Sequence, residues 1–517
     1  MIRGQALGDL LRRTARRSPD KLAVICGDVA WTYAELDRRV NRLARGLAAR
    51  GLATGDRVAI LARNSHAFVA LRFALARLGA VLVPVNFMLT ADEVAYVVRH
   101  AGARLLAVGP ELVALGAAAL ALGEHAVEAT IWLPGEAGGA APDGMVTFEA
   151  LLAQDDRAPE VELDPRALAQ IIYTSGTEAR PKGAMLSHEA LLWEYVSCVI
   201  EGELAEGDRV LHALPLYHCA QLDVFLGPAI YVGATNVITA SPAPDNLLAL
   251  FERHQITSFF APPSVWISLL RSPALVPEAL ALTKGYYGAS IMPVEVLREL
   301  LARLPGVRLW NFYGQTEIAP LATVLRPEDQ LRKAGSAGKP VLNVETRVVD
   351  DDLQDVAPGA IGEIVHRSPQ LLSGYYRDAE RTAAAFAGGW FHSGDLATVD
   401  AEGYITVVDR KKDMIKTGGE NVASREVEEA IYQLAGVSEV AVVGLPDPYW
   451  IEAVTAVVVG KPGHALDEPA VIAHCKARLA GFKVPKRVVF ADALPKNPSG
   501  KLLKRELRAT LGDKPAP

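Results

Sequence analysis

The feature that most limits the fold of this 517-residue chain is an alternation of short apolar runs with amphipathic helical segments over its first 300 residues. Thr32-Tyr33-Ala34-Glu35 has the form of a capping box, and apolar residues recur at helical spacing from Leu36 to Leu47. Strand-like runs at 58–61 and 80–85 enclose a helical segment at 66–78. Such alternation is typical of parallel sheets covered by helices, so we expect an α/β fold.

The sequence pattern changes after Arg332, where closely spaced short strands and turns are expected at 335–340, 344–349 and 362–365. This pattern predicts a small antiparallel sheet or barrel that closes the large domain. A charged segment, 409–412, follows a strand predicted at 404–408. Beyond it we expect a short α+β unit with helices at 424–434 and 469–479 and strands at 437–443 and 454–459. Because 517 residues exceed the size of one core, we place a domain boundary at the charged segment.

Targeting and membrane signals are weak in this sequence. The first 21 residues hold five arginines but no apolar core segment, so no signal or transit peptide is expected. The longest uncharged run, 224–244, is interrupted by glycines and prolines, and we interpret it as a buried strand, turn and strand rather than a membrane span. Four widely spaced cysteines suit neither a disulfide framework nor a paired zinc motif, which favours a reducing cytosol.

The segment 171–183, Ile-Ile-Tyr-Thr-Ser-Gly-Thr-Glu-Ala-Arg-Pro-Lys-Gly, is an apolar strand that runs into a loop of hydroxyls and small residues. Small residues let backbone N–H groups approach phosphate oxygens, and Lys182 supplies a cation. The loop differs from that of kinases and GTPases, because Pro181 rather than a glycine precedes the lysine. Taken alone, the segment also fits an ordinary strand-to-turn connection.

Four further motifs follow in order: Tyr313-Gly314-Gln315-Thr316-Glu317, Ser393-Gly394-Asp395-Leu396, the run 409–416, and Pro495-Lys496-Asn497-Pro498-Ser499-Gly500-Lys501. With the first loop they resemble the ordered motif set of the adenylate-forming superfamily, which includes acyl-CoA synthetases, beetle luciferases and nonribosomal peptide adenylation domains. The resemblance runs from Trp31 to Lys501 and points to the acyl-CoA synthetase branch, similar to bacterial fatty-acyl-CoA synthetases.

The resemblance implies an α/β fold with a large N-terminal adenylation domain, residues 1–409, made of helix-covered sheets and a small β-barrel-like subdomain. A small mobile α+β lid, residues 410–517, would follow a hinge at 410–412 centred on Lys412. It also implies a two-step reaction with ATP, Mg²⁺ and coenzyme A. Adenylation turns a carboxylate oxygen into a leaving group and releases pyrophosphate, and a thiol then displaces AMP.

Each motif carries an implied role in holding the nucleotide. Lys182 and the loop residues Thr174, Ser175, Gly176 and Thr177 would cradle the β- and γ-phosphates, and Glu317 would be the Mg²⁺ ligand. The adenine would lie between two segments, Gly288-Ala289-Ser290 and Asn311-Phe312-Tyr313, the second of which continues into Gly314 and Thr316. Asp395 would bind the ribose hydroxyls and Arg410 the ribose or a phosphate.

The implied roles of the lid residues divide between the two steps. Lys501 would contact the α-phosphate and the carboxylate during adenylation. After the lid rotates, Gly418 and Gly419 would line the pantetheine tunnel, with Trp450 as a weaker candidate for the same wall and Lys483 or Lys486 for the CoA phosphates.

The chain departs from the common family pattern at two places. Glu178 and Ala179 stand where a hydroxyl residue and a glycine are usual, so the Glu178 carboxylate must point outward, pair with Arg180 or bind Mg²⁺. Val484 occupies a position that holds an arginine in some relatives.

The acid to be activated is only partly defined by the sequence. His218 matches the residue that guards the acyl pocket, and Cys219 follows it where amino-acid activators carry an aspartate, so an α-amino acid is disfavoured. The neighbouring apolar residues are Val224, Phe225, Leu226, Phe259, Phe260, Val265 and Trp266. They suit a fatty or bulky hydrophobic acid, although such residues also form ordinary core.

Two rival functions remain beside the acyl-CoA ligase: an acyl-AMP ligase that loads a carrier protein, and an inactive nucleotide-binding homologue. Against the first, only a short span separates Asp395 from Arg410, with no insert that would restrain a lid. A basic strip at 482–508 is either a solvated helix face or a surface for ATP and CoA phosphates, since it lacks the interleaved aromatics of a nucleic-acid patch. The expected partner is a small carboxylic acid, with no nucleic acid and no membrane span, and a homodimer is compatible with the family.

Overall fold

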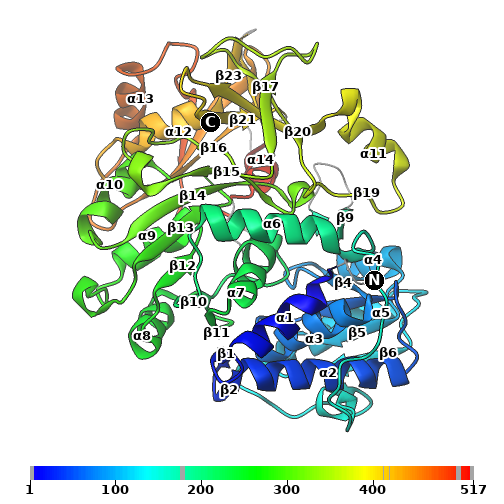
Figure 1. Cartoon of the computed structure of the whole chain (residues 1–517). Coiled ribbons are helices and arrows are strands. Elements are labelled where there is room, and N and C mark those ends of the chain that lie inside the picture. The colour runs from blue at the N-terminus through cyan, green and yellow to red at the C-terminus, as the bar shows by residue number, and fades with distance from the viewer. Residues whose placement is uncertain are drawn as a thin grey trace.

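The protein is described by a computed structural model over residues 5–174, 181–290, 292–411, 413–417, 420–496 and 502–512. Two large sheets form the body of the molecule, and α6 (His188–Glu201) contacts both of them (Figure 1). A four-stranded sheet and a separate C-terminal sheet complete the described part of the chain. The fold is the helix-covered α/β architecture that the sequence predicts.

The first large sheet has the strand order β19-β9-β8-β4-β3-β5-β6-β7. Its strands are β3 (Arg57–Leu61), β4 (Val81–Pro84), β5 (Leu105–Val108), β6 (Ala129–Trp132), β7 (Val146–Thr147), β8 (Leu168–Thr174), β9 (Lys182–Ser187) and β19 (Gly374–Tyr375). The strands β3 to β8 pair in parallel, whereas β9 runs antiparallel to β8 and to β19.

The second large sheet has the order β16-β15-β14-β13-β12-β10-β11-β1-β2. Its strands are β1 (Leu22–Cys26), β2 (Val29–Thr32), β10 (Arg209–His212), β11 (Thr235–Ile238), β12 (Ser258–Phe260), β13 (Lys284–Gly288), β14 (Arg308–Gly314), β15 (Leu321–Leu325) and β16 (Lys339–Pro340). Its central strands are parallel and its two ends antiparallel.

Helices connect and cover these strands. They are α1 (Leu7–Arg17), α2 (Tyr33–Ala49), α3 (His66–Leu78), α4 (Ala91–Ala101), α5 (Val113–Ala121), α7 (Gly227–Val232), α8 (Pro244–His254), α9 (Pro263–Arg271), α10 (Val294–Arg303) and α11 (Ala379–Ala385), with η3 (Ala220–Leu226) a π-helical turn. Short 3₁₀ turns lie at η1 (Pro110–Leu112), η2 (Glu149–Leu151), η4 (Pro277–Ala279), η5 (Thr316–Ile318), η6 (Pro327–Asp329) and η7 (Ala387–Gly389). No described helix combines the length and the apolar character needed to cross a bilayer.

The predicted capping box is present at the start of α2. The Thr32 hydroxyl accepts a hydrogen bond from the Glu35 backbone N–H at 3.2 Å, and the Glu35 carboxylate accepts one from the Thr32 N–H at 2.8 Å. Two otherwise unpaired N–H groups are thereby satisfied, which fixes where the helix begins.

The segment 224–244 contradicts the prediction of strand, turn and strand. The chain forms η3 and α7 there before it enters β11. The physical reason is Gly227-Pro228, since proline fits the first turn of a helix, where its missing N–H costs no hydrogen bond. Short apolar runs do not by themselves distinguish a buried strand from a buried helix.

The antiparallel sheet predicted after residue 332 is present as β17 (Glu345–Val349), β18 (Gly362–Arg367), β20 (Phe391–Val399) and β21 (Ile405–Arg410). Residues 339–340, which were expected to belong to this antiparallel sheet, instead extend the nine-stranded sheet as β16.

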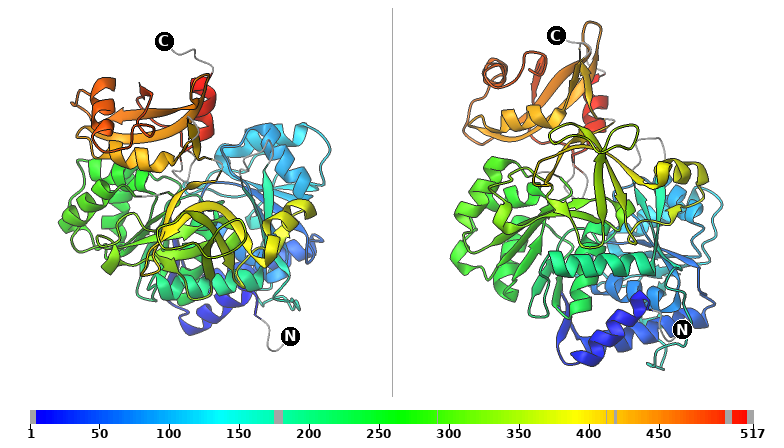
Figure 2. Two further views of the ribbon diagram at one scale, coloured as in Figure 1. Left: turned by 90° about the horizontal axis from the view of Figure 1, so that it is seen from above. Right: turned by 45° about the horizontal axis from the view of Figure 1, so that its top comes forward.

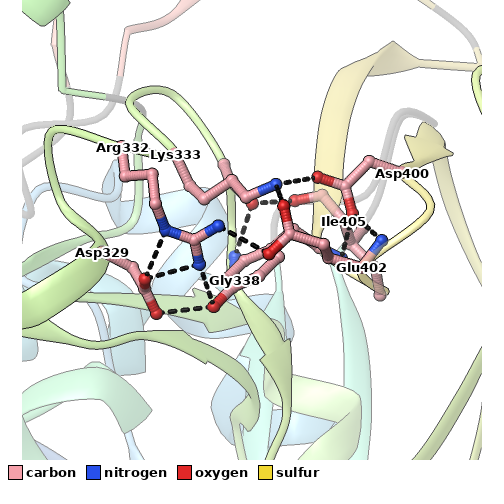
Figure 3. A network of polar contacts seen from close by, with 9 residues as sticks. Asp329, Arg332, Lys333, Gly338, Asp400, Glu402 and Ile405 are labelled. Atoms are coloured by element: carbon pink, nitrogen blue, oxygen red, sulfur yellow. Dashed lines mark hydrogen bonds and ion pairs between the residues drawn. The ribbon is translucent and has the colours of Figure 1, made fainter.

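A polar network joins the nine-stranded sheet to the four-stranded sheet (Figure 3). Arg332 pairs with Asp329 at 2.7 Å and with Glu402 at 2.5 Å, and Lys333 pairs with Asp400 at 2.5 Å.

The C-terminal part is a compact α+β unit, drawn in orange to red in Figure 2 and seated on the rest of the chain. Its elements are β22 (Ile415–Thr417), β23 (Glu420–Val422), α12 (Ser424–Tyr432), β24 (Val437–Asp447), β25 (Ile451–Gly460), α13 (Glu468–Lys476), β26 (Arg487–Phe490) and α14 (Lys504–Gly512). The sheet order is β23-β22-β25-β24, with β26 paired to β25.

The hydrophobic clusters of the described residues divide near position 410. Two clusters lie wholly within residues 415–511, and the other eight contain no residue beyond 407. Polar groups contact across the division: the Arg425 guanidinium donates to the Gly335 carbonyl at 2.6 Å, and the Glu429 carboxylate accepts from the Val294 N–H at 3.1 Å. Separate cores support the proposed boundary at 409–410.

A buried ion pair holds η3 in place on the side that faces away from Ala220 and Val224. The Arg72 guanidinium of α3 lies 2.6 Å from the Asp223 carboxylate of η3, and both side chains are at most 3% exposed. Gln170 of β8 accepts from Arg72 at 2.8 Å and donates to Asp223 at 2.7 Å. The Tyr195 hydroxyl of α6 accepts from Arg72 and donates to Asp223 at 3.2 Å. Together these hydrogen bonds satisfy the charges of Arg72 and Asp223, as a buried ion pair requires.

We predict that Arg72→Met lowers the free energy of unfolding by about 3–5 kcal/mol, because it leaves the Asp223 carboxylate buried without its partner. Arg157→Ala removes a surface ion pair with Asp155 and is the matched control. Urea titration followed by tryptophan fluorescence would check both variants. Equal effects of the two substitutions would contradict the structural role given to the buried pair.

Candidate active site

A cavity of about 580 Å³ opens where the two large sheets meet the four-stranded sheet. Its walls come from the ends of β8, β9 and β14, from η3, and from β19, β20 and β21. The predicted site residues that line it are Thr174, Lys182, His218, Ala289, Phe312, Tyr313, Gly314, Thr316, Glu317 and Arg410. Motifs that are far apart in the sequence are therefore brought to one place.

The cation and the carboxylate expected at the phosphates are neighbours. The Lys182 ammonium of β9 lies 3.3 Å from the Glu317 carboxylate of η5. The Tyr375 hydroxyl of β19 lies between them, 2.7 Å from the ammonium and 3.0 Å from the carboxylate. Tyr375 was not among the residues predicted from the sequence, because its Gly-Tyr-Tyr surroundings carry no chemical signature and only strand pairing brings it here.

Asp395 and Arg410, both predicted to contact the nucleotide, form an ion pair with each other. They face each other in the β20–β21 ladder, and the Arg410 Nε lies 2.9 Å from the Asp395 carboxylate. The other carboxylate oxygen accepts a hydrogen bond from the Tyr313 hydroxyl at 2.7 Å. Burial and the Asp395 charge raise the pKa of Tyr313 well above its usual value, so the phenol remains a donor.

The two segments expected to enclose adenine are adjacent parallel strands. Gly288 of β13 is in register with Phe312 of β14, and a Cβ at Gly288 would lie 2.3 Å from the Phe312 carbonyl oxygen, which explains the glycine. Ala289 follows with a φ of 61° and lines the cavity beside Ser290 in the chain. The Asn311 amide is buried and donates to the Ser336 carbonyl at 2.9 Å, so it fixes the strand end.

Two polar atoms of this cavity find no partner among the described residues. They are the Thr174 hydroxyl, at the entrance to the phosphate loop, and the side-chain amide nitrogen of Gln315. A buried polar group without a hydrogen bond costs free energy, so these atoms mark places where a bound molecule would supply the missing contacts.

Several predicted residues lie outside the described part of the chain. They are Ser175, Gly176, Thr177 and Glu178 of the phosphate loop, Lys412, Gly418, Gly419 and Lys501. Their roles, including the question raised by Glu178 and Ala179, stay predictions from the resemblance.

The wall beside His218 is formed by the π-helical turn η3. Its residues Ala220 and Val224 line the cavity, while Asp223 faces the opposite side in the buried ion pair with Arg72. The Cys219 sulfur lies 3.2 Å from the Thr316 hydroxyl, and burial raises the pKa of the Cys219 thiol, which is therefore not a nucleophile at neutral pH. π-helical turns are rare and occur frequently at functional sites.

Three stacked aromatic rings form the apolar end of the cavity. The Phe225 ring lies 4.5 Å from that of Phe260 and 5.7 Å from that of Phe312, and both pairs are close to parallel. All three rings line the cavity. Of the other apolar residues singled out in the sequence, Leu226, Phe259 and Trp266 belong to the protein core and Val265 packs against it.

The residues predicted to bind CoA lie on the C-terminal unit. The Lys483 ammonium pairs with the Glu426 carboxylate at 2.6 Å. The Lys486 ammonium lies 4.5 Å from the centre of the Trp450 ring, at the tip of the β24–β25 hairpin. Within the described residues, no group of three His, Cys, Asp or Glu side chains is arranged to hold a metal ion by itself.

Comparison with known proteins identifies the family of the chain. The family model for AMP-binding enzymes matches residues 11–376, and the model for their C-terminal domain matches residues 426–501. The chain belongs to the AMP-binding enzyme family. It is an AMP-forming acid–thiol ligase that uses ATP and coenzyme A.

Two curated relatives and one solved structure illustrate what this AMP-binding enzyme is similar to. A feruloyl-CoA synthase from Amycolatopsis sp is 40% identical over 99% of this chain and 100% of its own length. A long-chain-fatty-acid–CoA ligase from Mycobacterium tuberculosis is 35% identical over 97% and 98%. The ATP-bound crystal structure of MatB from Rhodopseudomonas palustris has a TM-score of 0.88 at 32% identity and covers 98% of this chain and 99% of that chain.

For this AMP-binding enzyme we predict that Asp395→Asn raises the KM for ATP about 10- to 100-fold, since hydrogen bonds to charged groups contribute about 1.5–3 kcal/mol. The KM for the acid should stay close to the wild-type value. Asp400→Asn, in the turn of the same β20–β21 hairpin but paired with Lys333, is the control. Steady-state kinetics would measure the KM for ATP and the KM for the acid separately. Equal changes in both KM values would contradict the assignment of Asp395 to the nucleotide.

Proposed function

We propose that this enzyme joins a fatty or bulky hydrophobic carboxylic acid to free coenzyme A in two steps, through an acyl-adenylate. The observation that carries the proposal is a single cavity with a charged end at Lys182, Glu317 and Arg410 and an apolar end at η3. A charged end suits the nucleotide, and an apolar end suits the hydrocarbon part of the acid.

In the first step the acid's carboxylate oxygen attacks the α-phosphorus of ATP, and the bond to pyrophosphate breaks. Lys182, together with the loop residues that begin at Thr174, would hold the leaving phosphates, and Lys501 would stabilise charge at the α-phosphate. Asp395 would accept hydrogen bonds from the ribose, and Tyr313 would pack against the adenine.

Glu317 is the residue we assign to Mg²⁺. A magnesium ion is commonly bound by one or two carboxylates together with substrate phosphates, so one carboxylate beside the phosphate-binding lysine fits this donor set. When bound there, the ion would neutralise charge on the phosphates. The task of Glu317 would be to fix the ion on the side of Lys182.

In the second step the CoA thiol attacks the acyl carbonyl, and AMP leaves. We propose that the unit beyond residue 410 moves between the steps about Lys412, so that Gly418, Gly419 and Trp450 come to line the CoA path. The division of the hydrophobic clusters near residue 410 supports such a movement, because no cluster of the described residues spans both units. A cytosolic location and a homodimer remain predictions.

The proposed acid class rests on the groups that face the apolar end. Ala220, Val224 and the three stacked rings carry no charge, and Asp223 of the same turn is occupied by Arg72, Gln170 and Tyr195. Among the described residues, a substrate ammonium would therefore find no available carboxylate at this apolar end, which disfavours α-amino acids. A planar aromatic acid and an alkyl chain can each pack against such aromatic rings, and relatives named for each class are similar to this chain.

The test is a panel of carboxylic acids assayed for AMP release with and without CoA. We expect AMP and a thioester only when acid, ATP, Mg²⁺ and CoA are all present, with hydroxycinnamic and long-chain acids preferred over amino acids. Acyl-AMP that is transferred to a carrier protein but never to free CoA would establish the acyl-AMP ligase instead.

We further predict that Ala220→Phe selects against bulky acids. The added ring would fill the space beside Val224, so the KM for a bulky acid should rise about tenfold or more, the scale of one poorly fitting apolar group. The KM for ATP and the use of a short acid such as butyrate should change little. A uniform loss with all acids would contradict the placement of Ala220 in the acyl wall.

A further inference from the structure

The Tyr375 hydroxyl occupies the only bridging position that the described residues give to Lys182 and Glu317. It lies 2.7 Å from the ammonium and 3.0 Å from the carboxylate. A phenol has one proton to donate and lone pairs to accept with, so the polarity of this arrangement is determined. Lys182 must donate to the oxygen, and the oxygen must donate to Glu317.

The position of the phenol is fixed by its backbone. Tyr375 pairs with Ala184 across the β19–β9 ladder, two residues from Lys182, and its N–H donates to the Thr382 hydroxyl at 2.9 Å. The side chain is about 5% exposed, and the Lys182 ammonium lies 4.2 Å from the ring centre. Cation, ring and hydroxyl thus come from two paired strands of one sheet, which leaves little freedom in their relative placement.

The direct contact between Lys182 and Glu317, at 3.3 Å, competes with the binding of phosphate and Mg²⁺, because each charge already has a partner. When the nucleotide binds, phosphate oxygens must replace Glu317 as the partner of Lys182, and a magnesium ion must replace Lys182 as the partner of Glu317. Both side chains must keep their orientation during this exchange. A neutral group that binds both side chains can hold them in place during the exchange, since its hydrogen bonds do not depend on the direct ion pair.

We propose that Tyr375 is a positioning residue for nucleotide binding: it orients the Lys182 ammonium toward the phosphates and the Glu317 carboxylate toward their Mg²⁺. The inference rests on the proposed function, in which these two residues receive the triphosphate and its ion. Tyr375 itself contacts neither reacting atom in this account.

The test uses Tyr375→Phe in the full-length enzyme, with Tyr376→Phe as the matched control. The first substitution keeps the ring under Lys182 and removes only the bridging oxygen, whereas the Tyr376 hydroxyl lies 3.5 Å from the Ala101 carbonyl. ATP binding is measured by calorimetry over a series of Mg²⁺ concentrations, without acid or CoA.

For Tyr375→Phe we expect the Mg²⁺ concentration that half-saturates ATP binding to rise about tenfold, the lower end of the 10- to 100-fold typical of outer-shell partners. Tyr376→Phe should behave as wild type. In kinetics the KM for ATP should rise while the KM for the acid is unchanged. In a Glu317→Gln background, Tyr375→Phe should have no further effect on the Mg²⁺ dependence, because both act through one contact.

The outcomes separate this inference from the proposed function. Wild-type Mg²⁺ dependence in Tyr375→Phe would overturn the positioning role alone. An equal shift in Tyr376→Phe, or an additive effect in the Glu317→Gln background, would also overturn it by showing a general disturbance of the sheet. Wild-type enzyme that binds no ATP at any Mg²⁺ concentration would overturn the proposed function, and this inference with it.

Discussion

The ion pair between Arg72 and Asp223 is the contact on which the geometry of the cavity depends. It joins α3, which contacts strands of both large sheets, to η3, which lines the apolar end of the cavity. Through Gln170 it also holds β8, the strand that places Thr174 at the charged end of the cavity. This buried network of hydrogen bonds therefore sets the distance between the two ends of the cavity. Hydrophobic packing alone would be less selective, since apolar side chains slide past one another more readily than paired charges.

Much of the fold could be predicted from the sequence, because local rules and tertiary structure agree here. The Thr32–Glu35 capping box, the helix at 66–78 and the antiparallel sheet beyond residue 344 all match their predicted positions closely. The motif glycines also have a physical reason: Gly288 and Gly314 stand where a Cβ would collide with neighbouring carbonyl oxygens. Such residues are recognisable because the constraint acts on the backbone itself.

What the sequence could not reveal depends on contacts between distant segments. The strand expected after Val224 is a π-helical turn followed by a helix, and that turn is anchored by the ion pair of Asp223 with Arg72, 151 residues away in the sequence. Tyr375 was missed for a similar reason, since it reaches Glu317 through the pairing of β19 with β9. Asn311 illustrates the reverse case: it lies within a recognised motif, yet its amide is buried against Ser336.

The division of the hydrophobic clusters near residue 410 has a thermodynamic consequence. The contacts between the two units include the Arg425–Gly335 and Glu429–Val294 hydrogen bonds, which water can replace. A change in their relative position would therefore expose little apolar surface. Heat-capacity changes and urea sensitivity both scale with newly exposed surface, so such a movement would leave only a small signature in either, quite unlike the unfolding of one of the units.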